Sequence, residues 1–215
     1  MNFQKNCVIL FSEWIEMEVR YMQNRVLPRN RQFLTIRELQ GQGFSHYIIN
    51  QMVEDGNLVK LNNKVYENTA YTGDASDFGY IAAYAPKGVV CLMSAARFYN
   101  LTTFLPDGID IAIERSMKIS TIPDWPTFHV WYFSKKRYES GINTASDGTA
   151  EFLVYDKEKT VADILSYRNK IGIEETKEII TNYLSLPNRN LNQLHRYAEI
   201  LGCNKILSTY LEVLL

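Results

Sequence analysis

Four charged residues close together in the sequence, Asp156, Glu158, Lys159 and Asp163, have the side-chain chemistry of a metal-dependent nuclease site. In such a site two carboxylates on a strand bind a divalent metal ion, and a lysine just beyond the second carboxylate faces the same side. Here Glu158 and Lys159 are adjacent and fall within an expected helix, which does not match that arrangement. A simpler interpretation is that Asp156 caps the helix and Glu158 stabilises its first turn. We therefore predict no catalytic residues.

The other residues that could do chemistry lack partners at a useful spacing. The three histidines, His46, His129 and His195, are far apart, and none has a cysteine, histidine or carboxylate at the spacing of metal ligands. Cys91 and Ser94 share an expected helix face without a nearby base, which argues against a nucleophile. No glycine-rich loop suited to phosphate occurs. The sequence predicts no enzyme, no bound metal and no cofactor.

The composition is that of an ordinary globular protein. The chain has 215 residues, of which 46% are hydrophobic and 22% charged, and its formal net charge is −1. This length suits one large domain or two small ones. The scattered cysteines, Cys7, Cys91 and Cys203, favour neither a disulfide framework nor a zinc site. The apolar run from Cys7 to Phe11 is too short for a signal peptide or a membrane span, so we expect a cytoplasmic protein with no membrane partner.

The N-terminal third predicts helices that position a polar face. Apolar residues spaced three or four apart from Val8 to Val26 indicate a helix that Pro28 ends, and a basic connector follows at 27–33. Thr35 and Glu38 have the spacing of a capping box for a short helix over 36–40. Ser45 is expected to cap the next helix. The residues expected on the buried side of that helix are Ile48, Ile49, Met52 and Val53.

A hairpin is expected after these helices. Gly56 falls where a left-handed C-cap would lie. Residues 57–61 and 64–66 then predict two strands, joined by a turn in which Asn62 and Asn63 take positive φ.

The rest of the chain predicts strands followed by helices. Residues 68–80 are expected to form a linker running into a helix, and 88–101, apolar at helical spacing, predict a further helix. The aromatic run within 127–133 breaks strict alternation, which favours a strand buried on both faces. The expected strands are 109–114, 127–133 and 150–155. The expected helices after Asp156 are 158–170, 174–186 and 191–215.

These elements favour an N-terminal winged helix-turn-helix at residues 1–70. In that fold the second helix enters the major groove and a β hairpin, the wing, contacts the DNA backbone. Seven basic residues against three acidic ones between positions 20 and 64 give a local charge of +4, which suits phosphate binding. Asn and Gln can bond an adenine edge, while His and Tyr suit phosphate or base contacts. The residues predicted to bind DNA are Arg29, Arg31, Thr35, Ser45, His46, Tyr47, Asn50, Gln51, Lys60, Asn62, Asn63 and Lys64.

Several segments together resemble one known family. The stretch "LTIRELQGQGFSHYIINQMVEDGNLVKLNNKVY" (34–66) is similar to the N-terminal domain of AbiEi-type antitoxins, the transcriptional-regulator component of type IV toxin–antitoxin and abortive-infection systems. The similarity continues, in the same order, through "GVVCLMSAARFYNLT" (88–102), "VYDKEKTVADILSYRNKIGIEE" (154–175) and "LNQLHRYAEILG" (191–202). It covers nearly the whole chain. None of these motifs is a catalytic signature. The resemblance rests on their occurring in the same order along the chain.

The resemblance implies two roles. The winged domain would repress its own operon by binding double-stranded DNA repeats in the promoter. The C-terminal domain would counteract a toxin of the nucleotidyltransferase type, without a stable complex between the two proteins.

We therefore expect an α+β protein in which a mixed α/β domain at 75–215, ending in helices, follows the winged domain. Lys135, Lys136 and Arg137 form the one basic run of that second domain. They are expected to be an exposed turn, and the alternative is that they form a patch used in antitoxin activity. Two alternatives remain open from the residues. One is a nuclease-like protein whose winged domain targets DNA, and the other is a non-enzymatic adaptor for protein interactions.

Overall fold

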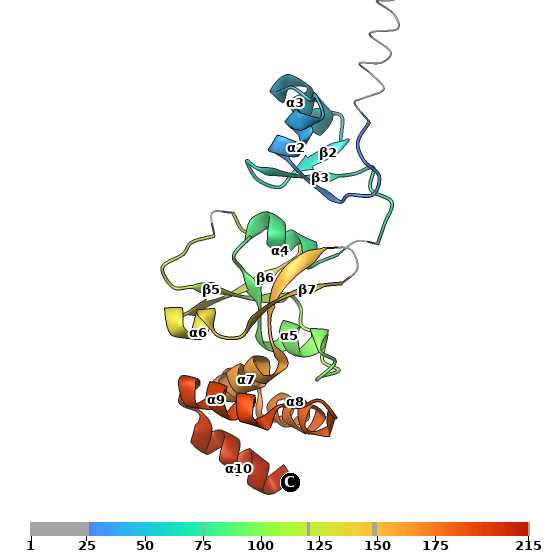
Figure 1. Cartoon of the computed structure of the whole chain (residues 1–215). Coiled ribbons are helices and arrows are strands. Elements are labelled where there is room, and N and C mark those ends of the chain that lie inside the picture. Colours follow the sequence, from blue (N-terminus) through green and yellow to red (C-terminus); the bar gives the residue numbers. More distant parts are fainter. Residues whose placement is uncertain (1–25, 75, 120, 148–149, 215) are drawn as a thin grey trace, which may run out of the picture. The chain divides into compact units, whose positions relative to one another are not determined.

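The computed structural model describes residues 26–74, 76–119, 121–147 and 150–214 (Figure 1). The chain divides into two compact units, Met1–Ala75 and Ser76–Leu215, and both contain helices and a β-sheet. The expected α+β class is confirmed. The helix expected up to Val26 lies outside the described residues, apart from Val26 itself, whose side chain is exposed.

The first unit contains a three-stranded antiparallel sheet in the order β1-β3-β2. Its strands are β1 (Phe33–Thr35), β2 (Leu58–Lys60) and β3 (Val65–Asn68). The sequence predicted the β2–β3 hairpin but no strand at 33–35, since the connector was expected to end at Phe33 and Thr35 was expected as a helix cap. The segment is a strand because Leu34 is fully buried and pairs with Tyr66 across the sheet.

Two short helices connect β1 to β2, and both begin at the predicted caps. In α2 (Ile36–Gly41) the Thr35 hydroxyl accepts from the Glu38 N–H, while the Glu38 carboxylate accepts from the Thr35 N–H at 2.7 Å. The Ser45 hydroxyl caps α3 (His46–Glu54). Gly56 has φ of 74°, and the bonds from Gly56 N to Val53 O and from Asn57 N to Met52 O close α3 in a Schellman motif. The capping predictions are confirmed.

The hairpin turn differs from its prediction. Neither Asn62 nor Asn63 has positive φ. Instead, the Asn62 Oδ1 accepts from the N–H groups of Lys64, at 2.8 Å, and Val65, at 3.0 Å. A side-chain oxygen therefore holds the turn, a known alternative to a turn built on left-handed residues.

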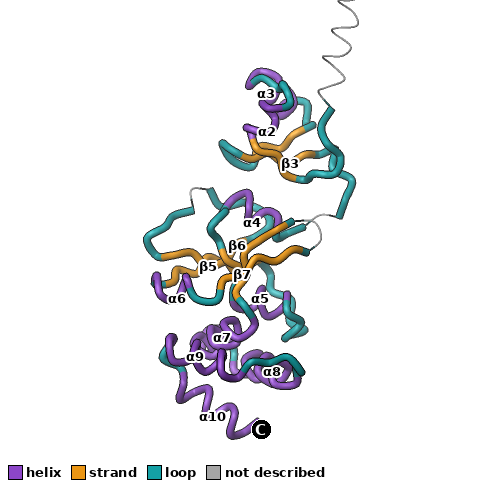
Figure 2. Tube along the Cα trace, viewed as in Figure 1, coloured by secondary structure: helices purple, strands orange, loops and turns teal. Residues whose placement is uncertain are grey.

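The second unit contains a five-stranded mixed sheet in the order β6-β5-β4-β8-β7 (Figure 2). Its strands are β4 (Val89–Val90), β5 (Ile109–Glu114), β6 (Phe128–Phe133), β7 (Ile142–Ser146) and β8 (Glu151–Tyr155). Strands β5, β6 and β8 were predicted. Strand β7 was not, and the two residues of β4 had been assigned to a helix. Val89 and Val90 are fully buried between β5 and β8, where β-branched side chains fit well.

Helices cover both faces of this sheet. Successive strand residues face opposite sides, so Phe133 and Tyr155, which pack with the C-terminal helices, point away from Phe128 and Phe152. On the Phe128 and Phe152 side lie rings of α4 (Gly79–Tyr84) and the residue before it, Phe78. Figure 1 shows the same division, with α4 on one side of the sheet and α7 on the other. The helices on the α7 side are α5 (Leu92–Phe98), α6 (Lys135–Glu139), α7 (Lys157–Ile171), α8 (Ile173–Ser185), α9 (Leu191–Leu201) and α10 (Asn204–Leu214).

The prediction that strand β6 is buried on both faces is wrong. It forms one edge of the sheet, and the Tyr132 side chain is 51% exposed. Lys135, Lys136 and Arg137, expected in a turn, lie in α6. Within the described ranges, none of the helices has the length and apolarity needed to cross a bilayer.

Candidate nucleic-acid interface

The outer face of α3 is polar and exposed. Tyr47 is 75% exposed, and Asn50, Gln51 and Glu54 are exposed on the same side of the helix, at the three- and four-residue spacing that brings side chains together. On the opposite side Ile49 is fully buried, and Ile48, Met52 and Val53 pack around the core of the first unit. The predicted buried face is confirmed. The Asn50 and Gln51 amides have no hydrogen-bond partner among the described residues, so both are available to a ligand.

Three predicted DNA-binding residues already have a role inside the unit. The hydroxyls of Thr35 and Ser45 cap the two helices. The His46 ring lies with Nε2 at 2.9 Å from Gln40 Nε2, a hydrogen bond between the two helices. These residues set the geometry of α2 and α3, so their contribution to binding would come largely from positioning.

Arg31 and Glu38 form an ion pair of 2.7 Å at the start of α2. Burial acts to raise the pKa of the Glu38 carboxyl, but the hydrogen bonds from Thr35 and the charge of Arg31 outweigh burial and lower that pKa. The charge of Arg31 is therefore partly neutralised, and its guanidinium is half exposed.

Asn68, which the sequence reasoning missed, fixes the turn that carries Arg29 and Arg31. Its buried side chain donates from Nδ2 to the carbonyls of Pro28, at 2.7 Å, and Arg31, at 2.9 Å. The Arg29 carbonyl also accepts from Thr72 N at 3.1 Å. A buried asparagine at the end of a strand gives no clue in sequence to a partner forty positions earlier.

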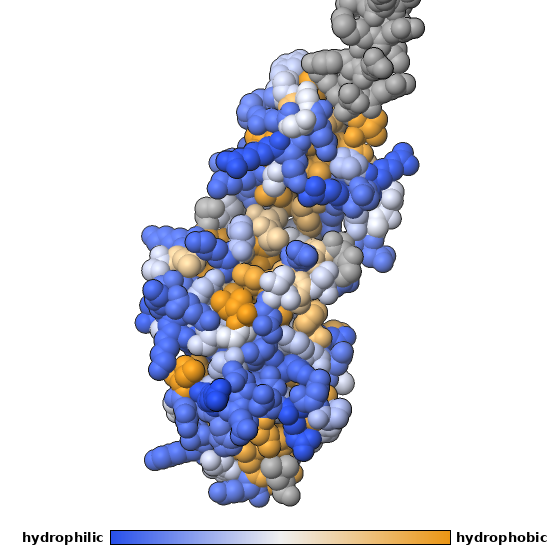
Figure 3. Space-filling view, viewed as in Figure 1, coloured by the Kyte–Doolittle hydropathy of each residue, from blue (hydrophilic) through white to orange (hydrophobic). Residues whose placement is uncertain are grey.

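The predicted wing residues lie around the β2–β3 hairpin. Lys60, on β2, and Asn63 and Lys64, in the turn, are exposed, while Asn62 holds the turn. Arg37 adds an exposed cation on α2. Between residues 26 and 74 the five basic residues are balanced by five acidic ones, because this range leaves out Arg20 and Arg25 and adds Glu67 and Asp74 to the residues counted between 20 and 64. Figure 3 shows that hydrophilic residues predominate on the visible face of this unit.

The basic run of the second unit separates into two parts. Lys135 and Lys136 are exposed. Arg137, predicted to be exposed with them, is not: its side chain is 15% exposed, and its Nη2 lies 2.7 Å from Oδ1 of the fully buried Asp163. Its guanidinium stacks on the rings of Phe133 and Tyr167, at 4.6 and 4.2 Å from their centroids. An arginine in this position stabilises the packing of α6 on α7 and is not part of a surface patch.

The four charged residues around the start of α7 are committed to internal bonds. The Asp156 carboxylate accepts from Lys159 N at 2.7 Å, which confirms the predicted cap. The buried Glu158 accepts from the Tyr183 hydroxyl and the Asn190 N–H, both at 3.1 Å. Lys159 Nζ donates to Asp163 Oδ2 in the core. No set of residues able to hold a metal ion occurs among the described residues.

Electrostatics at this cluster follow from burial. Burial lowers the pKa of Lys159, and the attraction of Asp163 offsets only part of that effect. Burial also raises the pKa of Asp156, although hydrogen bonds from the Tyr197 hydroxyl and Lys159 N act to lower it.

Cys91 and Ser94, the pair weighed in the sequence as a nucleophile, lie in the core. Cys91 is fully buried, and burial raises the pKa of its thiol well above the usual value. The Ser94 hydroxyl accepts from Asp110 N at 2.8 Å in the core.

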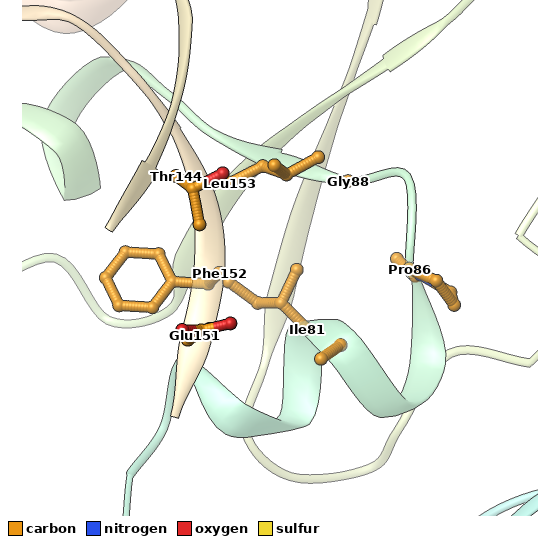
Figure 4. A pocket seen from close by; sticks show the side chains of 9 residues that line it. Ile81, Pro86, Gly88, Thr144, Glu151, Phe152 and Leu153 are labelled. Atoms are coloured by element: carbon orange, nitrogen blue, oxygen red, sulfur yellow. The ribbon is translucent and has the colours of Figure 1, made fainter. Parts of the chain in front are cut away.

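Two pockets flank the segment between α4 and β4. The smaller one, about 110 Å³, is mostly apolar, and Figure 4 shows Ile81 of α4 facing β8 across it, with Glu151 as its one charged lining residue. The larger one, about 430 Å³, has Lys87 and Lys118 among apolar residues. Neither lining combines a base with a nucleophile or with a second carboxylate.

Comparisons with known proteins add no identification: no protein-family model matches the chain, and no curated protein is found to be similar to it.

Proposed function

We propose that the first unit is a winged helix-turn-helix domain that binds double-stranded DNA at the promoter of its own operon. The supporting observation is the order β1-α2-α3-β2-β3, in which a three-stranded sheet carries two helices and a hairpin. In winged domains the second helix of the pair enters the major groove and the hairpin contacts the backbone. Here that helix is α3, with Asn50 and Gln51 free on its exposed side.

The wider role we propose is that of a transcriptional autorepressor and antitoxin of a type IV toxin–antitoxin system. The second unit would counter a nucleotidyltransferase-type toxin in the cytoplasm, without enzymatic activity and without a stable complex. The support for this part is the colinear similarity to AbiEi-type antitoxins. The internal bonding of Asp156, Glu158, Lys159 and Asp163 gives the nuclease alternative no support.

The DNA-binding part is tested with the full chain and labelled DNA from upstream of its own reading frame. Asn50→Ala and Gln51→Ala should each weaken binding by about 1–3 kcal/mol, the cost of a lost bidentate base contact. Asn192→Ala, an exposed asparagine of the second unit, is the matched control and should bind as the wild type does. Unchanged affinity and footprint in both α3 variants would exclude α3 as the reading helix.

The antitoxin part is tested by growth. Residues 76–215, a compact unit by itself, are expressed beside a nucleotidyltransferase-like toxin from the same operon. Rescue of growth by this fragment supports the assignment, and rescue that requires residues 1–75 contradicts it. Divalent-metal-dependent cleavage of DNA by the full chain would favour the nuclease alternative instead.

A further inference from the structure

Among the described residues, strand β6 presents one side of its backbone to no other strand. It forms the edge of the five-stranded sheet, and the strand beside it in that sheet is β5. The carbonyls of Thr127 and Phe133 accept from Ile109 N and Arg115 N beside β5, both at 2.8 Å. Because backbone groups alternate in direction along a strand, the odd-numbered residues of β6 bond to β5 and the even-numbered residues face outward.

The outward groups belong to Phe128, Val130 and Tyr132. Their N–H and C=O groups have no hydrogen-bond partner in the part of the chain that the structure describes. Exposed edges are normally protected by proline, by lysine or another charged residue, or by a bulge. The six residues of β6, FHVWYF, contain no proline, lysine, arginine or carboxylate, and all six pair with β5 in unbroken register. The one histidine, His129, has its ring beside Asp107 and Asp110. Such an edge is suited to pairing with another strand.

The two ends of β6 carry opposite charge. Asp107 and Asp124 are exposed near its N-terminal end, and Lys135 and Lys136 are exposed just beyond its C-terminal end. Lys135 contributes little to the stability of the chain itself, since it lies 3.9 Å from Glu139 in a pair whose two side chains are exposed. In an antiparallel self-pairing the acidic end of each strand lies beside the basic end of the other, and in a parallel one like charges meet.

We propose that β6 is a dimerisation edge, on which a second copy of this chain adds its own β6 in antiparallel orientation. The register is centred on Val130, because the outward-facing residues then bond pairwise: Val130 with its counterpart, and Tyr132 with Phe128 of the second copy. The two sheets become one ten-stranded sheet with a two-fold axis. Cross-strand aromatic pairs stabilise antiparallel sheets, and this register supplies two of them.

The other edge of the sheet is less suited to the same partner. Strand β7 is short of apolar residues, with the sequence INTAS, so a second copy would find no aromatic pair there. The proposal concerns the second unit alone and does not depend on DNA binding.

The test is the oligomeric state of the full chain without DNA, from sedimentation equilibrium over a series of concentrations. The wild type should show a monomer–dimer equilibrium. Val130→Pro removes the outward N–H without removing a bond to β5, and should raise the dimer Kd at least about 10-fold, since two hydrogen bonds across the axis are lost. A wild type that stays monomeric at all concentrations overturns the proposal, and so does a folded Val130→Pro variant with unchanged Kd.

A charge exchange tests the orientation and does not alter the strand. Lys135→Glu with Lys136→Glu should weaken the dimer, and adding Asp107→Lys with Asp124→Lys should restore it. Lys177→Glu with Lys205→Glu, two exposed lysines on α8 and α10, makes the same change of net charge away from β6 and should leave the Kd unchanged. The antiparallel pairing is refuted if the control pair raises the dimer Kd as much as the β6 pair does. It is also refuted if the fourfold variant does not recover the wild-type Kd.

Discussion

The buried ion cluster of the second unit predicts a large stability loss on removal of one charge. Asp163 is fully buried between two cations, with Oδ2 bonded to Lys159 Nζ and Oδ1 2.7 Å from Arg137 Nη2. The second contact is close but lacks the alignment of a hydrogen bond, so it acts mainly through charge. Asp163→Asn would leave two cations in the core with no anion between them.

Removing one partner of a buried pair costs about 3–5 kcal/mol, because the remaining charge stays desolvated. We expect a loss in this range for Asp163→Asn, toward its lower end, because Lys159 can release its proton when its lowered pKa falls further. Urea unfolding of the full chain, followed by the fluorescence of Trp125 and Trp131 in the second unit, measures the free energy.

Lys135 and Glu139 provide a matched control. They form another lysine–carboxylate pair four residues apart, exposed at 72% and 58% of their side chains. Glu139→Gln should cost no more than about 0.5 kcal/mol, as exposed helix pairs do. A second variant combines Lys159→Met with Asp163→Asn. It removes one of the two unpaired buried cations and should recover part of the lost free energy of unfolding. An Asp163→Asn cost equal to that of Glu139→Gln would refute the claim that the cluster holds α6 and α7 together.

Three further outcomes are expected. The raised pKa of Asp156 means that the folded state holds its proton at pH values where the unfolded chain has lost it, so the stability of the second unit should fall as pH rises above about 4. Asp156→Asn keeps the cap and should make the melting temperature fall less steeply with pH than in the wild type, where Asp110, whose pKa burial also raises, contributes the rest. Asn68→Ala removes the two bonds to the 28–31 turn and should cost about 1–3 kcal/mol, with weaker DNA binding, and normal stability would contradict the role given to Asn68. Lys60→Ala with Lys64→Ala should reduce the salt slope of DNA binding by about 0.9 per lysine, whereas an unchanged slope places the phosphates elsewhere.

The features predicted from sequence are those set by nearby residues. Thr35, Ser45 and Asp156 act on N–H groups three residues away, so residue type and spacing are enough to predict their roles. The buried side of α3 follows from helical period in the same way. Gly56 ends α3 because a left-handed residue is needed just past the last turn.

Features that depend on distant partners were missed. Strand β1 has three residues, and it is a strand because β3 lies beside it, about thirty positions later in the chain. Val89 and Val90 are buried on all sides at the centre of the sheet, and an apolar run of this kind does not separate a strand from a helix by period. The fold of these segments is decided by tertiary contacts, which no local pattern contains.

The run Lys135, Lys136, Arg137 illustrates the same limit at a site. In sequence the three cations are equivalent neighbours, and a common exposed patch is the natural prediction. Once α6 forms, helical rotation turns adjacent side chains about 100° apart, and the third points at the sheet and α7 while the first two face solvent. Arginine suits the inward position, because its planar guanidinium can stack on Phe133 and Tyr167 while it meets a carboxylate. Of these three cations the proposed dimer edge therefore uses Lys135 and Lys136, and Arg137→Ala should reduce stability through lost packing and through loss of the second cation beside Asp163, which keeps its bond to Lys159. A variant that keeps wild-type stability but loses the dimer would instead place Arg137 at the surface with its neighbours.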